Sequence, residues 1–81
     1  MEQMTQKESK FISHLVSGLY AEPGFSDVEP QDIAAASGFS DHQVAGLISS
    51  LQEKGIVEMD DYGFVHLAES HWSLHPEWAA Q

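Results

Sequence analysis

Gly38 divides the middle of the chain into two segments whose apolar residues recur at helical spacing. The shorter segment, residues 30–37, has the sequence PQDIAAAS, and the longer one, residues 40–54, has the sequence SDHQVAGLISSLQEK. Glycine adopts a left-handed backbone conformation without steric cost, so Gly38 predicts a tight turn between two helices. A small residue such as Ala34 allows the two helices to cross closely. This stretch therefore predicts a crossed helix pair.

Polar residues and a proline mark the expected beginnings of three helices. Thr5 and Glu8 fit a capping box, in which each side chain accepts a backbone amide hydrogen bond from the other residue. Ser40 and Gln43 fit the same motif at the start of the longer segment. Pro30 suits the first helical position, because its fixed φ matches a helix and its missing N–H is not needed there.

A polar loop is expected after the first helix. This helix should end near Tyr20 or Ala21, because the residue before Pro23 avoids helical angles. Phe25 is predicted to anchor the loop under the core, and Val28 to form a strand of one or two residues.

Apolar stripes on the first and third predicted helices indicate the core. Gly55 is expected to end the third helix after Lys54, a cation that suits the negative end of the helix dipole. The stripes consist of Phe11, Ile12, Leu15, Val16, Leu19 and Tyr20 on the first helix and of Val44, Leu47, Ile48 and Leu51 on the third.

Two short β-prone runs follow, IVEM at residues 56–59 and FVHL at residues 64–67, and Gly63 in the turn between them predicts a tight hairpin. The expected fold class is therefore mainly α with a small β-hairpin (α+β), in a single domain over residues 1–81 with its core at 5–67. The tail, residues 68–81, is expected to be extended or irregular and to pack on this core. Trp72 and Trp78 in the tail either complete the core or form a dimer or partner surface.

The charge of the chain restricts its partners. Three lysines, no arginine and thirteen acidic residues give a net charge of −10. Such a charge repels nucleic acid and anionic membranes. The negative charge has two equally weighted explanations: a reason specific to a partner, or a generally acidic proteome, as in a salt-adapted host. The chain has no cysteine, no leader-like segment and no run of 18 apolar residues, so we expect a cytoplasmic protein that does not enter a membrane.

The order of helices and hairpin resembles that of winged-helix (winged helix-turn-helix) proteins, including small uncharacterised regulator-like proteins of phages and bacteria. The resemblance covers about residues 5–67. Ser37 departs from the family pattern, which prefers an apolar residue there, and Ala36 is expected to cover the gap. The residues that match the helix-turn-helix pattern are Ile33, Ala34, Gly38, Phe39, Val44 and Leu47.

The resemblance implies a recognition helix and a wing. The groove-facing positions would be Ser40, Asp41, His42, Ala45, Gly46 and Ser49, with Gln43, Ser50 and Lys54 as further polar candidates, and the wing tip would be Asp60, Asp61 and Tyr62. Serine, histidine and glutamine can hydrogen-bond base edges, but no arginine is present to bind guanine in a bidentate manner.

Two function classes stay open at this point. The first is a regulator that binds DNA weakly through residues 40–50, as a monomer or as a homodimer. The family resemblance favours this class by a small margin. The second is a winged helix used for protein–protein contact, which the net charge favours because DNA contacts depend largely on lysine and arginine.

Histidines and acidic residues do not form a recognisable catalytic or metal-binding pattern. His71 and His75 are four residues apart, a spacing that suits a metal ion only on a regular helix, and Pro76 argues against one. No nucleophile framework or glycine-rich phosphate loop is present. We therefore expect no enzyme activity, no metal site and no cofactor.

Overall fold

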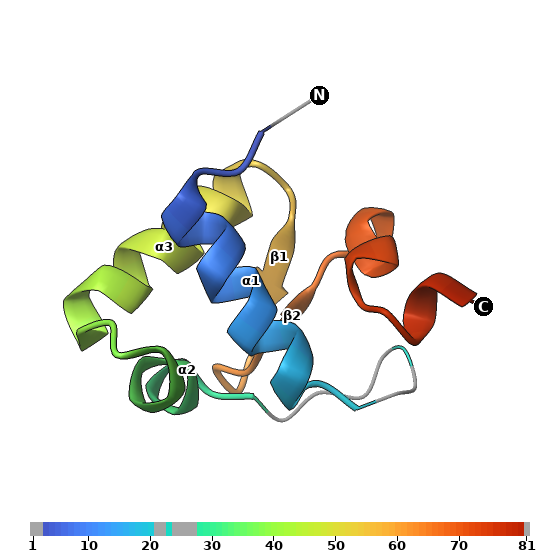
Figure 1. Ribbon diagram of the computed structural model, residues 1–81. Coiled ribbons are helices and arrows are strands. Elements are labelled where there is room, and N and C mark those ends of the chain that lie inside the picture. Colours follow the sequence, from blue (N-terminus) through green and yellow to red (C-terminus); the bar gives the residue numbers. More distant parts are fainter. Residues whose placement is uncertain (1–2, 21–22, 24–27, 81) are drawn as a thin grey trace.

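The computed structural model describes residues 3–20, 23 and 28–80. Figure 1 shows α1 in the middle of the molecule, with α3 and α2 at the left and the last segments of the chain at the right. The elements in chain order are the helices α1 (Gln6–Gly18), α2 (Pro30–Ser37) and α3 (Asp41–Glu53), the strands β1 (Val57–Met59) and β2 (Val65–Leu67), and the 3-10 helices η1 (Glu69–Leu74) and η2 (Trp78–Ala80). The fold is thus mainly helical with a two-stranded antiparallel hairpin, which confirms the predicted α+β class.

Helix α1 begins at the predicted capping box and ends earlier than predicted. Glu8 N donates to Thr5 Oγ1 at 3.1 Å, and Thr5 N donates to Glu8 Oε1 at 2.8 Å. Gly18 is the last helical residue, and Leu19 is already extended, so the prediction of an end near Tyr20 is wrong. Beyond this end, the Tyr20 carbonyl accepts a hydrogen bond from the Trp78 indole N–H at 2.8 Å. The predictions for Ala21 and Phe25 lie outside the described residues.

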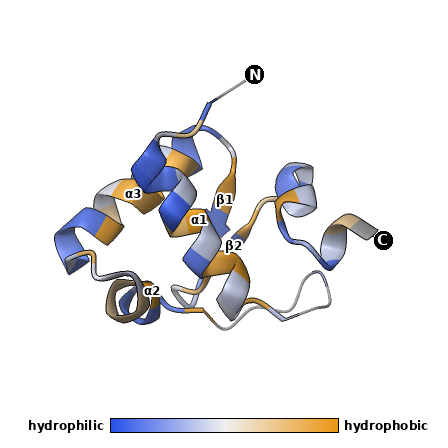
Figure 2. Ribbon diagram, in the orientation of Figure 1, coloured by the Kyte–Doolittle hydropathy of each residue, from blue (hydrophilic) through white to orange (hydrophobic). Residues whose placement is uncertain are grey.

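The turn between α2 and α3 has the predicted chemistry. Gly38 ends α2 in the left-handed conformation, with a φ of 83°. Ser40 Oγ accepts from Gln43 N at 3.1 Å, and Gln43 Oε1 accepts from Ser40 N at 2.9 Å, which confirms the capping box of α3. Figure 2 shows hydrophilic and hydrophobic residues interspersed along α3, as an amphipathic helix requires.

The helix-turn-helix pattern prefers an apolar residue at position 37. Ser37 at this turn makes two hydrogen bonds instead. Its hydroxyl donates to the Ile33 carbonyl at 2.6 Å and accepts from Phe39 N at 3.2 Å. Ala36 is exposed, so the expectation that it covers the gap at Ser37 is wrong. The polar side chain is satisfied locally, and no apolar cover is needed.

The hairpin pairs Val57 with Leu67 and Met59 with Val65. It follows α3 directly, because Gly55, with a φ of 73°, lets the chain leave the helix. Val28 does not form the predicted strand. Its carbonyl nevertheless accepts a hydrogen bond from Val65 N at 2.8 Å and so ties the segment before α2 to the hairpin.

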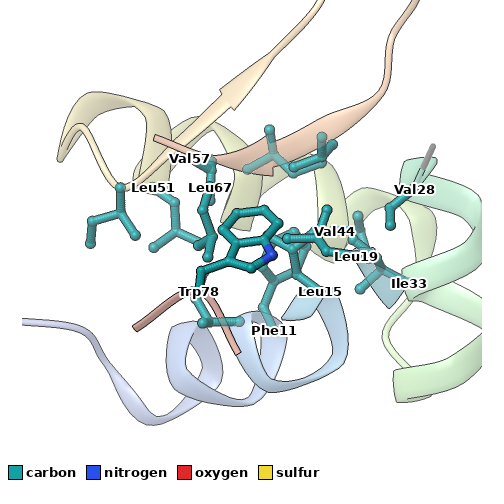
Figure 3. Close-up of a cluster of buried hydrophobic side chains, with 14 residues drawn as sticks. Phe11, Leu15, Leu19, Val28, Ile33, Val44, Leu51, Val57, Leu67 and Trp78 are labelled. Carbon is teal, nitrogen blue, oxygen red and sulfur yellow. The ribbon is translucent and has the colours of Figure 1, made fainter. Parts of the chain in front are cut away.

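The core lies between α1, α3 and the hairpin, and the tail contributes Trp78 (Figure 3). Trp78 is only 4% exposed and completes the core, which was one of the two roles predicted for it. Trp72 is half-buried, and its ring packs against that of Trp78. Tyr20, predicted in the core stripe, is more than half exposed. The buried apolar cluster consists of Phe11, Ile12, Leu15, Leu19, Val28, Ile33, Val44, Ile48, Leu51, Ile56, Val57, Val65, Leu67 and Trp78.

The tail forms two 3-10 helices, not the extended or irregular segment that the sequence predicted. His75 between them is buried, and its ring stacks on Trp78 with a centroid distance of 4.4 Å. His75 Nδ1 accepts hydrogen bonds from the backbone amides of Glu77 and Trp78 at 3.2 and 3.4 Å. These contacts hold the turn at Pro76 and place the indole of Trp78 against α1. No helix in the described part of the chain has both the length and the apolar character needed to cross a bilayer.

Two glycines in helices provide a matched stability test. At Gly46 an added Cβ would meet nothing within 4 Å, whereas at Gly18 it would lie 3.0 Å from a methyl carbon of Val28. We expect Gly46→Ala to raise the free energy of unfolding by about 0.5–1 kcal/mol, because alanine loses less backbone entropy in a helix. Gly18→Ala should gain less or be destabilising, because Val28 must move. Urea denaturation of both variants measures the difference, and an equal gain would contradict the crowding at Val28.

Candidate functional site

Exposed side chains form one continuous side of α3, which we call the outward side. It carries two acidic residues and no lysine. Its members are Asp41, His42, Gly46, Ser49 and Glu53. The sequence predicted all of them as site residues except Glu53. His42, Gly46, Ser49 and Glu53 are spaced by three or four residues and therefore lie on one side of the helix, opposite the buried residues of the core, and Asp41 precedes His42 in the first turn.

Ser40 and Gln43, also predicted as site residues, are exposed but already engaged. Each side chain accepts the backbone N–H of the other in the capping box. Both therefore define where α3 begins. Base-edge hydrogen bonds through the Ser40 oxygen would compete with the cap that starts the helix.

Lys54 and Ser50 do not lie with the outward side, where the sequence analysis grouped them. Both are half-buried and turn toward Glu8 of α1, whose side chain is only 2% exposed. Lys54 Nζ lies 2.6 Å from Glu8 Oε1, and Ser50 Oγ donates to Glu8 Oε2 at 2.8 Å. Lys54 Nζ also donates to the carbonyl of Gln3 at 2.9 Å. The charge of this lysine is therefore used inside the molecule.

These contacts lower the pKa of Glu8 from 4.5 to about 2. The largest cause is the hydrogen bond from Lys54, followed by that from the Thr5 backbone, and both stabilise the ionised carboxylate. Burial acts in the opposite direction but is the weaker influence. Glu8 thus stays charged in the folded protein because three donors surround its oxygens.

The other two lysines lie on α1. Lys10 places its ammonium 5.2 Å from the centre of the Phe39 ring, within the range of a cation–π contact. Phe39 directly precedes Ser40, so Lys10 lies near the beginning of α3. Lys7 is exposed and three residues earlier on α1, on the same side of that helix.

The hairpin tip presents one large exposed side chain. Asp60 Oδ1 accepts the backbone amides of Tyr62 and Phe64 at 2.9 and 3.0 Å, so this carboxylate organises the turn. Gly63 completes it with a φ of 89°. The Tyr62 side chain is 87% exposed, and Asp61 is exposed beside it. Of the predicted tip residues, Asp61 and Tyr62 are thus available to a partner, while Asp60 has a structural role.

A hollow with a volume of about 470 Å³ lies between α3, the beginning of α2 and the end of β1, and we call it the α3 groove. Sequence analysis missed it, because it depends on how Pro30 and Met59 are placed against α3. The apolar residues that line it are Pro30, Val44, Ala45, Ile48 and Met59. The polar ones are Gln31, Asp41, Ser49 and Gln52. Ser50 and Lys54 are not among them, because they project toward α1.

The histidines are dispersed in the fold. Among residues 3–20, 23 and 28–80, no three histidine, aspartate or glutamate side chains are close enough together to hold a metal ion. His71 Nδ1 lies 2.9 Å from the hydroxyl of its neighbour Ser70, and His75 uses Nδ1 within its own turn. His71 lies at a kink within η1 and His75 directly follows that element, so the two residues do not share a regular helix.

Comparison of the chain with protein-family models, with curated proteins and with solved structures finds no match. The candidate site is therefore defined by its own geometry: the outward side of α3, the α3 groove beside it and the hairpin tip.

The lowered pKa of Glu8 predicts a specific pH dependence. A group with a depressed pKa contributes stability above its unfolded pKa and loses it as the pH falls through its folded pKa. We expect Glu8→Gln to lower the free energy of unfolding by about 2 kcal/mol at pH 7, because hydrogen bonds to a charged group are lost. The difference from the native protein should shrink as the pH falls from about 4.5 toward 2.

Urea denaturation of both proteins at pH 7 and pH 3 measures this difference. The matched control is Glu53→Gln on the exposed end of α3, which should change stability by less than about 0.5 kcal/mol. A Glu8→Gln effect that is the same at both pH values would show that the carboxylate charge is not what stabilises the fold.

Proposed function

We propose that this protein is a non-enzymatic winged-helix protein that contacts another protein through α3 and the hairpin tip. The order of three helices and a hairpin supports the winged-helix assignment. The hydrogen bond from Val65 N to the Val28 carbonyl supports it further, because it joins the segment before α2 to the hairpin where a short third strand would pair. The proposal includes no catalytic step and no cofactor.

The position of Lys54 is the observation that favours a protein partner over DNA. Lys54 is the only basic residue of the segment that resembles a recognition helix, and Glu8 holds its ammonium at 2.6 Å. The outward side of α3 then presents Asp41 and Glu53 without a cation. DNA affinity comes largely from lysine and arginine contacts to phosphates, so this surface lacks the usual source of binding energy.

DNA binding is kept as the second candidate because of Lys10. Its ammonium lies over Phe39 at the beginning of α3, with Lys7 on the same side of α1 and His42 exposed on the first turn of α3. Two lysines at phosphates would give a salt dependence of only about −1.8 in log K against log salt, from roughly −0.9 per contact. Such binding would be weak and largely lost at physiological salt.

Titration of labelled mixed-sequence duplex DNA at low salt separates the two candidates. The protein-contact proposal expects no change in fluorescence anisotropy up to about 100 µM protein, because the acidic surface repels phosphates. Binding that tightens at low salt and is weakened by Lys10→Gln and by Lys7→Gln, but not by Ser73→Glu, which makes the same change in net charge on the exposed tail, would replace the proposal with a specific DNA contact beside α3.

A second experiment tests the protein contact directly. Native protein and two variants are compared as bait in host lysate: Ser49→Glu on the outward side of α3 and Ser13→Glu on an exposed position of α1. The proposal expects a partner protein that native protein and Ser13→Glu retain and that Ser49→Glu loses at least fivefold. Equal recovery by both variants would exclude the outward side of α3 as the contact.

A further inference from the structure

The α3 groove combines an apolar floor with a carboxylate, that of Asp41, at one end. Val44 and Ile48 of α3 form part of the floor, and Met59 at the end of β1 lines the hollow from the hairpin. Met59 is 38% exposed, although it is large and apolar. Methionine has a flexible and polarisable side chain that adapts to different partners. A volume of about 470 Å³ is within the range of sites that hold small molecules or peptide side chains.

The line of residues along α3 gives the groove its direction. Asp41, Ala45 and Ser49 are spaced by four residues and therefore lie one above another on the helix. From Asp41 to Gln52 the helix rises by about 16 Å, at roughly 1.5 Å per residue. This length matches two to three turns of a helical segment laid against α3, with the carboxylate at one end and amide and hydroxyl groups along the rim.

Charge complementarity identifies the kind of segment. Among the described residues that line the groove, Asp41 is the only charged one, and the whole chain has a net charge of −10. A nucleic acid would bring phosphates to Asp41. A second copy of this chain would bring the same negative charge and only three lysines, of which Lys54 is paired with Glu8. A basic peptide fits both the carboxylate and the overall field.

We propose that the α3 groove binds a basic amphipathic helical segment of a partner protein. An apolar side chain of the segment enters the hollow over Val44 and Ile48, and a lysine or arginine near it pairs with Asp41. Helices bind to grooves through such anchors at spacings of three, four and seven residues. The inference rests on the proposed protein contact and adds the chemistry of the partner and the place where it binds.

Asp41 also has a simpler role, which the experiment must separate from binding. A carboxylate in the first turn of α3 interacts favourably with the positive end of the helix dipole without any ligand. The comparison therefore needs a variant with the same charge change away from α3 and the hairpin tip. Glu69→Lys provides it, because Glu69 is exposed in the first turn of η1 and does not line the groove.

The probe is a 14-residue amphipathic lysine–leucine peptide, with a glutamate–leucine peptide of the same pattern as its control. Two-dimensional amide NMR of the full chain follows each titration. We expect saturable shifts at the amides of Val44, Ala45 and Ile48 with the basic peptide and none with the acidic one. Asp41→Lys should weaken binding at least fivefold, whereas Glu69→Lys should change it by less than twofold.

A second pair of variants keeps the test valid if Asp41→Lys does not fold. Ala45→Lys fills the groove and adds a cation, and Ala35→Lys makes the same change on an exposed position of α2 outside it. We expect a loss of at least fivefold only for Ala45→Lys. Dispersed amide spectra of all four variants establish that each is folded.

Four outcomes would overturn the inference. Equal weakening by Asp41→Lys and Glu69→Lys would mean that the peptide responds to overall charge, and shifts centred away from α3 would place binding elsewhere. If host lysate yields a partner protein that Ser49→Glu loses, but the basic peptide does not bind, the basic helical occupant is refuted and the proposed function stands. Duplex DNA that shifts the same amides would refute the inference and the proposed protein contact together.

Discussion

A buried carboxylate on the first helix organises the fold and its surface. Glu8 is almost entirely removed from solvent, and an unpaired charge in such a position would strongly destabilise a protein of this size. Hydrogen bonds from Thr5, Ser50 and Lys54 offset the cost of burying this charge. The same residue thus caps α1 and joins it to the end of α3 by a polar contact beside the apolar core.

This arrangement has a consequence for function. The lysine that follows the recognition-like helix is turned inward to neutralise Glu8, and the outward side of α3 is left with acidic and small polar residues. Figure 1 shows the tail on the opposite side of α1 from α3. Trp78 and His75 therefore complete the core without covering the α3 groove, and the part of the molecule best suited to a partner stays open. The arrangement of helices and hairpin thus favours DNA as the partner, whereas the charge favours a protein. The proposed function follows the charge.

The local features of the fold were predictable from the sequence. Both capping boxes, the left-handed Gly38 and the hairpin around Gly63 depend on residues within a few positions of one another, and the structure confirms them. The sequence placed the end of α1 after Gly18, the last helical residue, and it could not show that the Tyr20 carbonyl pairs with Trp78, which is 58 residues away. The packing of the tail was equally hidden, because Trp78 is buried in a core built from α1, α3 and the hairpin.

The candidate site was only partly predictable for the same reason. Helical spacing was sufficient to place Asp41, His42, Gly46 and Ser49 on one exposed side of α3. It could not show that Lys54 meets Glu8, a contact between residues 46 positions apart, and it therefore left Lys54 among the exposed candidates. The α3 groove likewise requires Pro30 and Met59 to come together across α3, and neither residue is distinctive in the sequence.

The pKa of the Glu8 side chain tests the central claim most directly, because it reports whether Lys54 is engaged inside the protein. It can be measured by NMR titration of the Glu8 carboxyl carbon in the folded protein. The account predicts a pKa of about 2. A pKa near the ordinary value of 4.5 would mean that Lys54 does not hold the carboxylate, and the lysine would then be available at the surface for DNA.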